Sequence, residues 1–158
     1  MAGRRAAIAM SEAEVAAYLA EQTKLQVASL GKDGAPHLTT LFHVLVDGRV
    51  AFWTYSTSQK IRNLERDDRI ACLTESGEEY AELRGVSIRG RAELVRDPAR
   101  VLEIGTAVAL RMLRLGSPAD LGEVGMAEVR RQAGKRTAVV VHPEHVASWD
   151  HAKLSGPR

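Results

Sequence analysis

The stretch FWTYSTSQKIRNLERDDRIACL, residues 52–73, contains the junction that decides the fold. It begins as an apolar, alternating run typical of a strand, and hydroxyl side chains then accumulate from Thr54 to Ser58 ahead of Lys60. Ser58 is a favoured N-cap residue and predicts a helix that continues to about Arg66. The first N–H groups of a helix lack partners within it and carry the positive end of its dipole, so this junction predicts a phosphate site. A plain helix cap beside a solvated lysine is the alternative.

The residues before the junction predict antiparallel strands. Three β-like runs cover Leu25–Leu30, His37–Val46 and Arg49–Tyr55, and the turns KDG and VDGR separate them. Asp-Gly between alternating apolar runs is a strong hairpin signal, so we expect an antiparallel meander. A helix should precede it, because Ser11 followed by Glu14 is a capping-box pattern.

The residues after the junction predict further strands and two helices. RIACLTE is a strand, and the long alternating run at 80–95 contains Gly85 and Gly90, as the corners of a barrel require. A helix is expected over 97–115, with Asp97 as its N-cap, and a short one near 127–134. The run RTAVVVHPEHVASWD closes the chain with one or two strands. The fold class expected is mainly β with peripheral helices, arranged as a small antiparallel barrel.

Length and composition favour a single folded domain spanning 1–158, with a flexible segment at 1–10. A net charge of +2 and few aromatic residues argue against nucleic-acid binding. No run approaches the roughly 20 apolar residues of a membrane span, and the chain has one cysteine, so we expect a cytoplasmic protein without membrane partners. The expected helix at 97–115 is apolar on more than one face, which predicts a homodimer.

The pattern W-T-x-x-x-S-Q-K-x-x-N-L at residues 53–64 resembles the phosphate-binding signature of the pyridoxamine 5′-phosphate oxidase-like split-barrel superfamily. The resemblance extends over nearly the whole chain. TKLQVASLGKDGAPHLTTLFHV looks like the first hairpin of these proteins, and VVVHPEHVASWDHAKL looks like the closing strand of the branch that uses flavins or deazaflavins. The resemblance implies an antiparallel split β-barrel of the FMN-binding type.

The departures from this pattern bear on the choice of cofactor. The relatives that bind FMN carry basic residues at both ends of the strand LTTLFH, where this chain has Leu38 and His43. The arginine-rich C-terminal substrate signature of the true oxidases is also missing. The resemblance therefore favours reductases that use coenzyme F-420, a deazaflavin with a phosphate and an acidic oligoglutamate tail. Arg62, Arg66 and Arg69 would serve that tail, although an ordinary solvated basic face is the alternative.

The resemblance also implies which residues form the site. The backbone of residues 39–42 would run along the edge of the cofactor ring, the junction would hold its phosphate, and a small-molecule substrate would stack on the open face near a dimer interface. No catalytic side chain and no metal site are expected, because hydride transfer between bound rings needs alignment and exclusion of water. The alternatives are an FMN-binding oxidoreductase of the same type and a non-catalytic flavin- or tetrapyrrole-binding protein. The expected cofactor-binding residues are Thr39, Thr40, Leu41, Phe42, Trp53, Thr54, Ser58, Gln59, Lys60 and Arg62.

Overall fold

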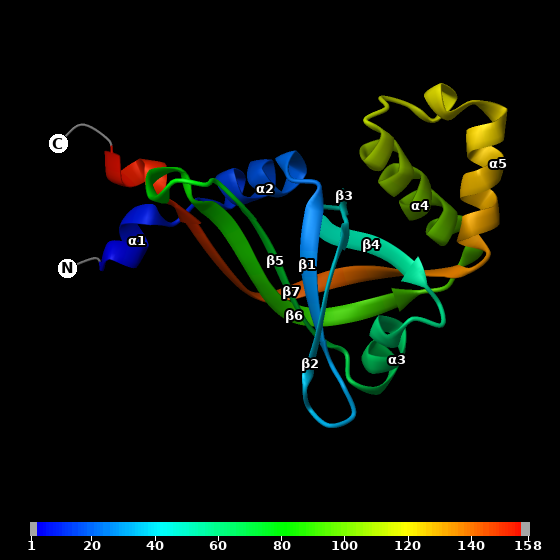
Figure 1. Ribbon diagram of the computed structural model, residues 1–158, viewed down its shortest axis with the longest axis horizontal. Helices are drawn as coiled ribbons and strands as arrows, with labels where there is room; N and C mark the ends of the chain where they lie inside the picture. The colour runs from blue at the N-terminus through cyan, green and yellow to red at the C-terminus, as the bar shows by residue number, and fades with distance from the viewer. Residues whose placement is uncertain (1–2, 156–158) are drawn as a thin grey trace.

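The computed structural model describes residues 3–155, and within them seven strands form one antiparallel sheet that curls into a half-barrel with helices around it (Figure 1). This confirms the expected fold class. The strands are β1 (Lys24–Leu30), β2 (Pro36–Phe42), β3 (Val44–Val46), β4 (Arg49–Tyr55), β5 (Arg69–Ser76), β6 (Arg84–Val95) and β7 (Arg136–Asp150). The helices are α1 (Arg4–Ile8), α2 (Glu12–Glu21), α3 (Gln59–Arg66), α4 (Pro98–Leu113) and α5 (Gly122–Ala133), with short 3₁₀ turns η1 (Tyr80–Glu82), η2 (Pro118–Leu121) and η3 (His151–Ser155).

The strand order β2-β1-β5-β6-β7-β4-β3 places consecutive strands at the two edges of the sheet. β2 and β3 are joined at His43, whose backbone N–H donates to the Thr23 carbonyl at 3.1 Å. The run expected as one strand over His37–Val46 is therefore two strands. Both expected hairpins are confirmed, because β1 pairs with β2 and β3 pairs with β4, but the break at His43 puts them at opposite edges of the sheet instead of in one continuous meander. A curling sheet must bend between its two edges, and the chain makes that bend at the buried His43.

The first half of β7 is buried on both faces. Val139 and Val141 point into the barrel core, whereas Ala138 and Val140 pack on the outer side, beneath α4. This explains why β7 opens with an apolar run instead of an alternation. Trp53 lies on the same outer face, and its ring occupies the space that a side chain on Gly105 of α4 would need.

The predicted helix starts are confirmed by their caps. The Ser58 hydroxyl accepts from the Ile61 N–H, and Asp97 accepts from the Arg100 N–H at 3.0 Å. Ser11 forms the complete capping box of α2 with Glu14. In each case a short side chain satisfies a backbone donor that the helix leaves without a partner.

Two boundaries differ from the sequence expectation. The helix expected near 127–134 begins earlier, at Gly122, because the helix-disfavouring residues Gly122 and Gly125 conceal its first turns in the sequence. The long strand expected from 80 begins at Arg84, since η1 occupies the residues before it.

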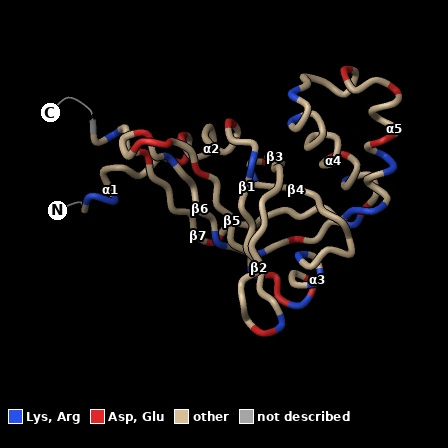
Figure 2. Tube along the Cα trace, in the orientation of Figure 1, with Lys and Arg blue, Asp and Glu red and all other residues tan. Residues whose placement is uncertain are grey.

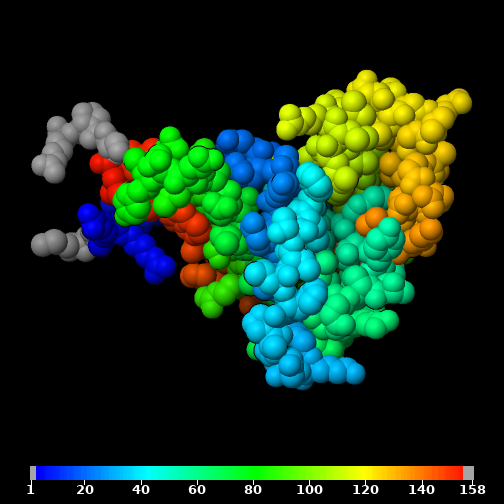
Figure 3. Space-filling model, viewed as in Figure 1, coloured from blue at the N-terminus to red at the C-terminus, as the bar shows by residue number. Residues whose placement is uncertain are grey.

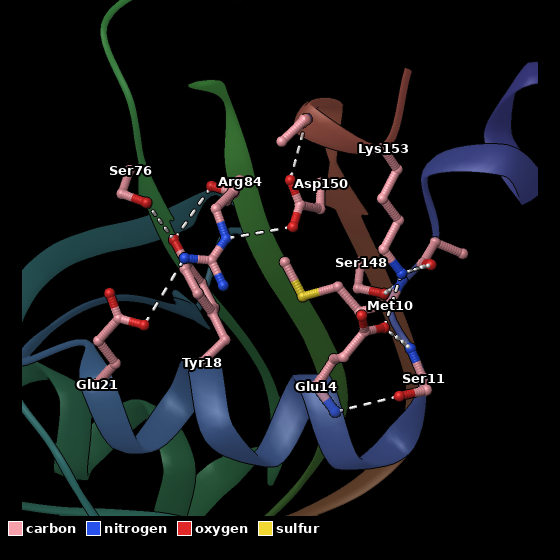
Figure 4. Close-up of polar contacts among 12 residues, drawn as sticks. Met10, Ser11, Glu14, Tyr18, Glu21, Ser76, Arg84, Ser148, Asp150 and Lys153 are labelled. Atoms are coloured by element: carbon pink, nitrogen blue, oxygen red, sulfur yellow. Dashed lines mark hydrogen bonds and ion pairs between the residues drawn. The ribbon is translucent and has the colours of Figure 1, made fainter. Parts of the chain in front are cut away.

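One end of the molecule is held together by a cluster around Arg84, which we call the Arg84 clamp (Figure 4). The buried Tyr18 of α2 donates from its hydroxyl to the Arg84 carbonyl at 3.1 Å and lies 2.9 Å from the Ser76 hydroxyl. The Arg84 guanidinium lies over the Tyr18 ring and pairs with Glu21 at 3.7 Å and Asp150 at 3.5 Å. The clamp thus fixes α2 to β5, β6 and β7.

The first and last described segments meet at this same end (Figures 1 and 3). The Met10 N–H donates to the Ser148 hydroxyl at 3.0 Å, and the Lys153 ammonium contacts Glu14 at 2.7 Å. Within the segment expected to be flexible, residues 4–8 form α1, and residues 1–2 lie outside the described residues; its flexibility stays a prediction. Over residues 3–155, no helix has the length and apolar character needed to cross a membrane.

Candidate functional site

The junction between β4 and α3 brings hydroxyl groups and an ammonium group to one end of the barrel. Thr54 is the last buried residue of β4, with 8% of its surface exposed. The chain then turns, and the Ser58 N–H donates to the Tyr55 carbonyl at 2.9 Å before α3 begins. The Ser58 hydroxyl caps Ile61, so the N–H groups of Gln59 and Lys60 remain without a partner inside the helix.

Lys60 is the charged group of this junction. Its side chain is half-buried, and among residues 3–155 it forms neither an ion pair nor a hydrogen bond. Burial lowers the pKa of Lys60 below its ordinary value, because a desolvated ammonium group is destabilised without a counter-charge. A bound phosphate would supply that counter-charge and would accept from the unpartnered N–H groups, so the donor set fits a phosphate.

The rest of α3 anchors the helix. The Gln59 side chain donates to Asn63, and the buried Asn63 donates to the Ser29 hydroxyl of β1 at 3.1 Å. Arg66 donates to the Leu30 carbonyl at 2.6 Å, and Arg69 pairs with the neighbouring Asp67. These contacts fix the position of Lys60 relative to the barrel.

The arginines expected to form a track for an acidic tail are therefore not equivalent. Arg66 and Arg69 are engaged with the protein itself, whereas the exposed Arg62 has no partner among the described residues. Only Arg62 of this track keeps its charge available for a ligand without breaking a contact.

An apolar cavity of about 390 Å³ lies between the barrel and the helices α4 and α5, and residues 54–60 do not line it. Leu41, Phe42 and Trp53 line its barrel side, and Val108 and Met112 belong to its helical wall. The structure thus brings together the apolar members of the expected cofactor-binding set, with Trp53 on the outer face of the sheet, whereas Thr54, the next residue of β4, points to the other face. We call this space the Trp53 cavity.

The remaining expected residues lie on β2. Thr40 is exposed, and the hydroxyl of Thr39 is buried without a hydrogen-bond partner in the described part of the chain. A buried hydroxyl usually has a partner, so Thr39 is a polar group that a bound molecule could satisfy.

Arg136 is a residue of the site that the sequence interpretation missed. Its guanidinium lies 4.9 Å from the centre of the Trp53 ring and 4.1 Å from that of Tyr55, and it lines the Trp53 cavity. Cation–π contacts of this kind hold an arginine in place. The available signal was a basic residue directly ahead of an apolar strand, but only the register places Arg136 opposite Tyr55.

The single cysteine and the possible metal-ligating side chains are the other groups that could carry chemistry. Cys72 is buried, which raises the pKa of its thiol to about 12. Within residues 3–155, no three side chains of His, Cys, Asp or Glu gather in the arrangement that a metal ion needs.

Comparisons with known proteins identify the family to which the chain belongs. The family model described as pyridoxamine 5′-phosphate oxidase matches residues 11–150. Among solved structures, the conserved hypothetical protein Rv2991 from Mycobacterium tuberculosis is 36% identical with a TM-score of 0.88, over 98% of this chain and 93% of that chain. No curated protein matches the chain.

More distant structures share the fold alone. An F420 reductase is 20% identical with a TM-score of 0.61, over 82% of this chain and 94% of that chain. HutZ, the heme storage protein from Vibrio cholerae, is 16% identical with a TM-score of 0.66, over 89% of this chain and 97% of that chain. Proteins on this fold therefore include both a reductase and a storage protein.

Proposed function

This chain belongs to the pyridoxamine 5′-phosphate oxidase family, and from that premise we propose that it is an oxidoreductase that uses coenzyme F-420 to transfer hydride to a small organic substrate. The observation that carries the proposal is the half-buried Lys60, unpaired among residues 3–155, at the start of α3. A protein that stabilised only itself would have little reason to keep an ammonium group there without a counter-charge.

Each part of the site would have a separate task. Lys60 and the first N–H groups of α3 would bind the cofactor phosphate, with the hydroxyls of Thr54 and Ser58 beside them. Leu41, Phe42 and Trp53 would exclude water from the ring, since their cavity is apolar. The bound deazaflavin would supply the hydride. The chain would contribute orientation and a dry environment, and no side chain is assigned proton transfer.

Two features favour F-420 over FMN. At the position where FMN-binding relatives carry a basic residue, this chain has Leu38, whose surface is 67% exposed. Arg62 offers an exposed charge on α3, unpaired within residues 3–155, for an acidic tail. Leucine cannot form an ion pair with the flavin phosphate, so FMN loses one charge contact. The acidic tail of F-420 can gain one from Arg62, which favours F-420.

Titration with both cofactors tests the proposal. Trp53 lines the cavity, so its fluorescence should report ring binding; a Trp149→Phe background removes the second tryptophan, which packs on Gly85 in the Arg84 clamp. We expect F-420 to bind more tightly than FMN, and its affinity to fall more steeply with salt because more charge pairs are screened. Tighter binding of FMN would reverse the order. Turnover of the reduced cofactor separates a catalyst from a carrier.

We also propose a homodimer with the site near its interface. The inner face of α4 is buried, but Met112 and Leu113 at its end are 50% and 60% exposed. Both line the Trp53 cavity, and they leave apolar surface at its edge that a second copy would cover. Sedimentation at micromolar concentration should give a dimer, and a Met112→Glu variant should weaken it. A stable monomer of the parent protein would contradict the proposal.

A further inference from the structure

A second cavity, of about 420 Å³, lies on the other side of Arg136. It is formed where β6 leads into α4 and where α5 leads into β7, and Figure 2 shows basic residues gathered along the second of these connections. Its polar lining consists of Ser56, Arg96, Arg130, Arg136 and Thr137, and we call it the arginine cavity. No aspartate or glutamate is among the residues that line it.

The charges of this cavity are largely uncompensated. Arg96 pairs with Glu65 at 2.5 Å, but Arg130 has no ion-pair partner within residues 3–155. Arg136 has no carboxylate partner there either; its one hydrogen bond runs to the Gln132 side chain at 3.3 Å. The Nε atom of Arg136 is buried and has no acceptor among the described residues. A buried guanidinium donor needs an acceptor, and two oxygens of a carboxylate or a phosphate fit its fork.

Hydroxyl groups complete the polar side of the cavity. The Ser56 and Thr137 hydroxyls lie 2.9 Å apart, and the Ser56 N–H donates to the Lys135 carbonyl at 3.0 Å. Each hydroxyl has one hydrogen, so after one donates to the other, the second hydroxyl still has a hydrogen to donate. The opposite wall includes Val101 and Leu102 of α4, so the cavity is apolar on one side and cationic on the other.

Arg136 connects this cavity to the Trp53 cavity, because it lines both. We propose that the arginine cavity binds the oxyanion, a carboxylate or a phosphate, of a small molecule whose apolar part lies against α4. Arg130 and Arg136 would pair with the oxyanion next to the face of Trp53. That this molecule is the substrate rests on the proposed function, whereas the binding site itself does not.

A plainer role for Arg130 exists, because it lies near the end of α5, where a cation offsets the negative end of the helix dipole. Arg131 shares that position but pairs with Glu128 at 2.6 Å and does not line the cavity. The neighbouring arginines are therefore a matched pair: the same helix end and the same charge, with only one of them facing the cavity.

Calorimetric titration of the protein without cofactor tests the site. The probes are benzoate and phenyl phosphate, which carry the two candidate oxyanions on the same apolar body, with acetate to measure the contribution of that body. Arg130→Gln should weaken binding of the preferred probe at least tenfold, as should Arg136→Gln. Arg131→Gln should bind it as the parent does. Arg130 is exposed, so its variant stays informative if Arg136→Gln fails to fold.

Lys60→Ala separates this site from the cofactor phosphate site. Benzoate or phenyl phosphate bound equally well by Lys60→Ala and lost in Arg130→Gln would support the arginine cavity, whichever probe binds more tightly. Binding lost in Lys60→Ala and kept in Arg130→Gln would overturn the inference and leave the phosphate site standing. Equal losses in Arg130→Gln and Arg131→Gln, or no binding of either probe, would also overturn it.

Discussion

The two ends of the barrel handle charge in opposite ways. In the Arg84 clamp, the guanidinium is stacked on Tyr18 and paired with Glu21 and Asp150, and nearby Lys153 is paired with Glu14. At the other end, Lys60, Arg130 and Arg136 have no carboxylate partner within the described residues. Both ends are rich in polar residues, so composition alone does not distinguish them.

This difference in charge pairing indicates which end of the barrel binds a ligand. A charge that meets its partners within the chain contributes to structure, and its removal should cost stability. A partly buried charge without a partner costs stability until something binds, and its removal should cost affinity. Variants at the two ends should therefore separate into two classes, one detected by unfolding and the other by titration.

Tyr18→Ala should give the largest effect and should act on stability alone. Tyr18 is fully buried, and truncating a large buried aromatic residue costs about 3–5 kcal/mol in the free energy of unfolding. Denaturant unfolding measures this loss, with Tyr80→Ala, a tyrosine that is 66% exposed, as the control that should change little. Cofactor affinity, measured where the variant is folded, should match the parent. A tenfold loss of cofactor affinity in Tyr18→Ala would contradict the proposal that the clamp end acts on stability and not on binding.

Lys60→Ala should give the converse result. Truncating one member of a desolvated charge pair costs roughly 2–5 kcal/mol in binding, and even the low end is more than tenfold in the dissociation constant. Without cofactor, the melting temperature should stay the same or rise, because an unpaired, half-buried ammonium is removed. Lys153→Ala, at the clamp end, is the matched lysine control and should leave affinity unchanged. If Lys60→Ala binds F-420 and FMN as the parent does, Lys60 is only a helix residue beside a cap.

The sequence predicted local features more reliably than the way the sheet closes. Caps, turns and the glycine-interrupted strand are set by neighbouring residues, so Ser11, Ser58 and Asp97 could be assigned correctly from the sequence. The break at His43 could not, because it follows from joining the two edges of a sheet whose middle strands come later in the chain. The run at 37–46 has a strand-like pattern both before and after His43, so the pattern does not reveal where one strand ends and the next begins.

The residues of the candidate site likewise fall into two groups, those that the sequence predicted and those that only the fold reveals. Residues 53–60 are contiguous, so their pattern could be interpreted directly, and the structure keeps Thr54, Ser58 and Lys60 at one junction. Arg136 comes into the site through the pairing of β4 with β7, more than seventy residues further along the chain. Arg130 comes through α5, whose first turns the sequence concealed. Contacts that depend on register and helix placement required the fold.

His43 extends the comparison to a fully buried polar residue that lines neither the Trp53 cavity nor the arginine cavity. Its Nε2 atom lies 3.0 Å from the Leu19 carbonyl, and its Nδ1 atom is buried with no partner from residues 3–155. Burial, with the nearby Arg111 as a smaller cause, lowers the pKa of His43 below its ordinary value of 6.5. The folded protein thus resists protonation that the unfolded chain accepts.

Stability should therefore fall with acidity because of His43. Its contribution is fully present above about pH 6.5 and is lost as the pH falls toward the lower folded pKa, at no more than about 1.4 kcal/mol per pH unit for one group. Denaturant unfolding from pH 7.5 to 5 should show a smaller slope in His43→Gln than in the parent. His145→Gln, which changes an exposed histidine, should keep the parent's slope. Equal slopes in all proteins would remove His43 as the cause.

The smallest expected effects come from Ser11 and Ser58, which are matched N-caps at opposite ends of the molecule. Ser11 accepts from the Glu14 N–H beside the clamp, and Ser58 accepts from the Ile61 N–H beside Lys60. Replacing either by alanine should cost about 1 kcal/mol in the free energy of unfolding, because each hydroxyl satisfies a backbone donor at a helix start. Denaturant unfolding compares the pair directly.

Affinity for the cofactor should differ between Ser58→Ala and Ser11→Ala, although the two variants should lose similar amounts of stability. Ser58→Ala loosens the first turn of α3, whose N–H groups would hold the cofactor phosphate, so its affinity for F-420 should fall, by less than in Lys60→Ala. Ser11→Ala changes a helix that contributes nothing to that junction, and its affinity should equal the parent's. Titration of both variants at one salt concentration decides the point. Equal affinities would mean that the hydroxyls of both ends only cap helices, and the phosphate site would then rest on Lys60 alone.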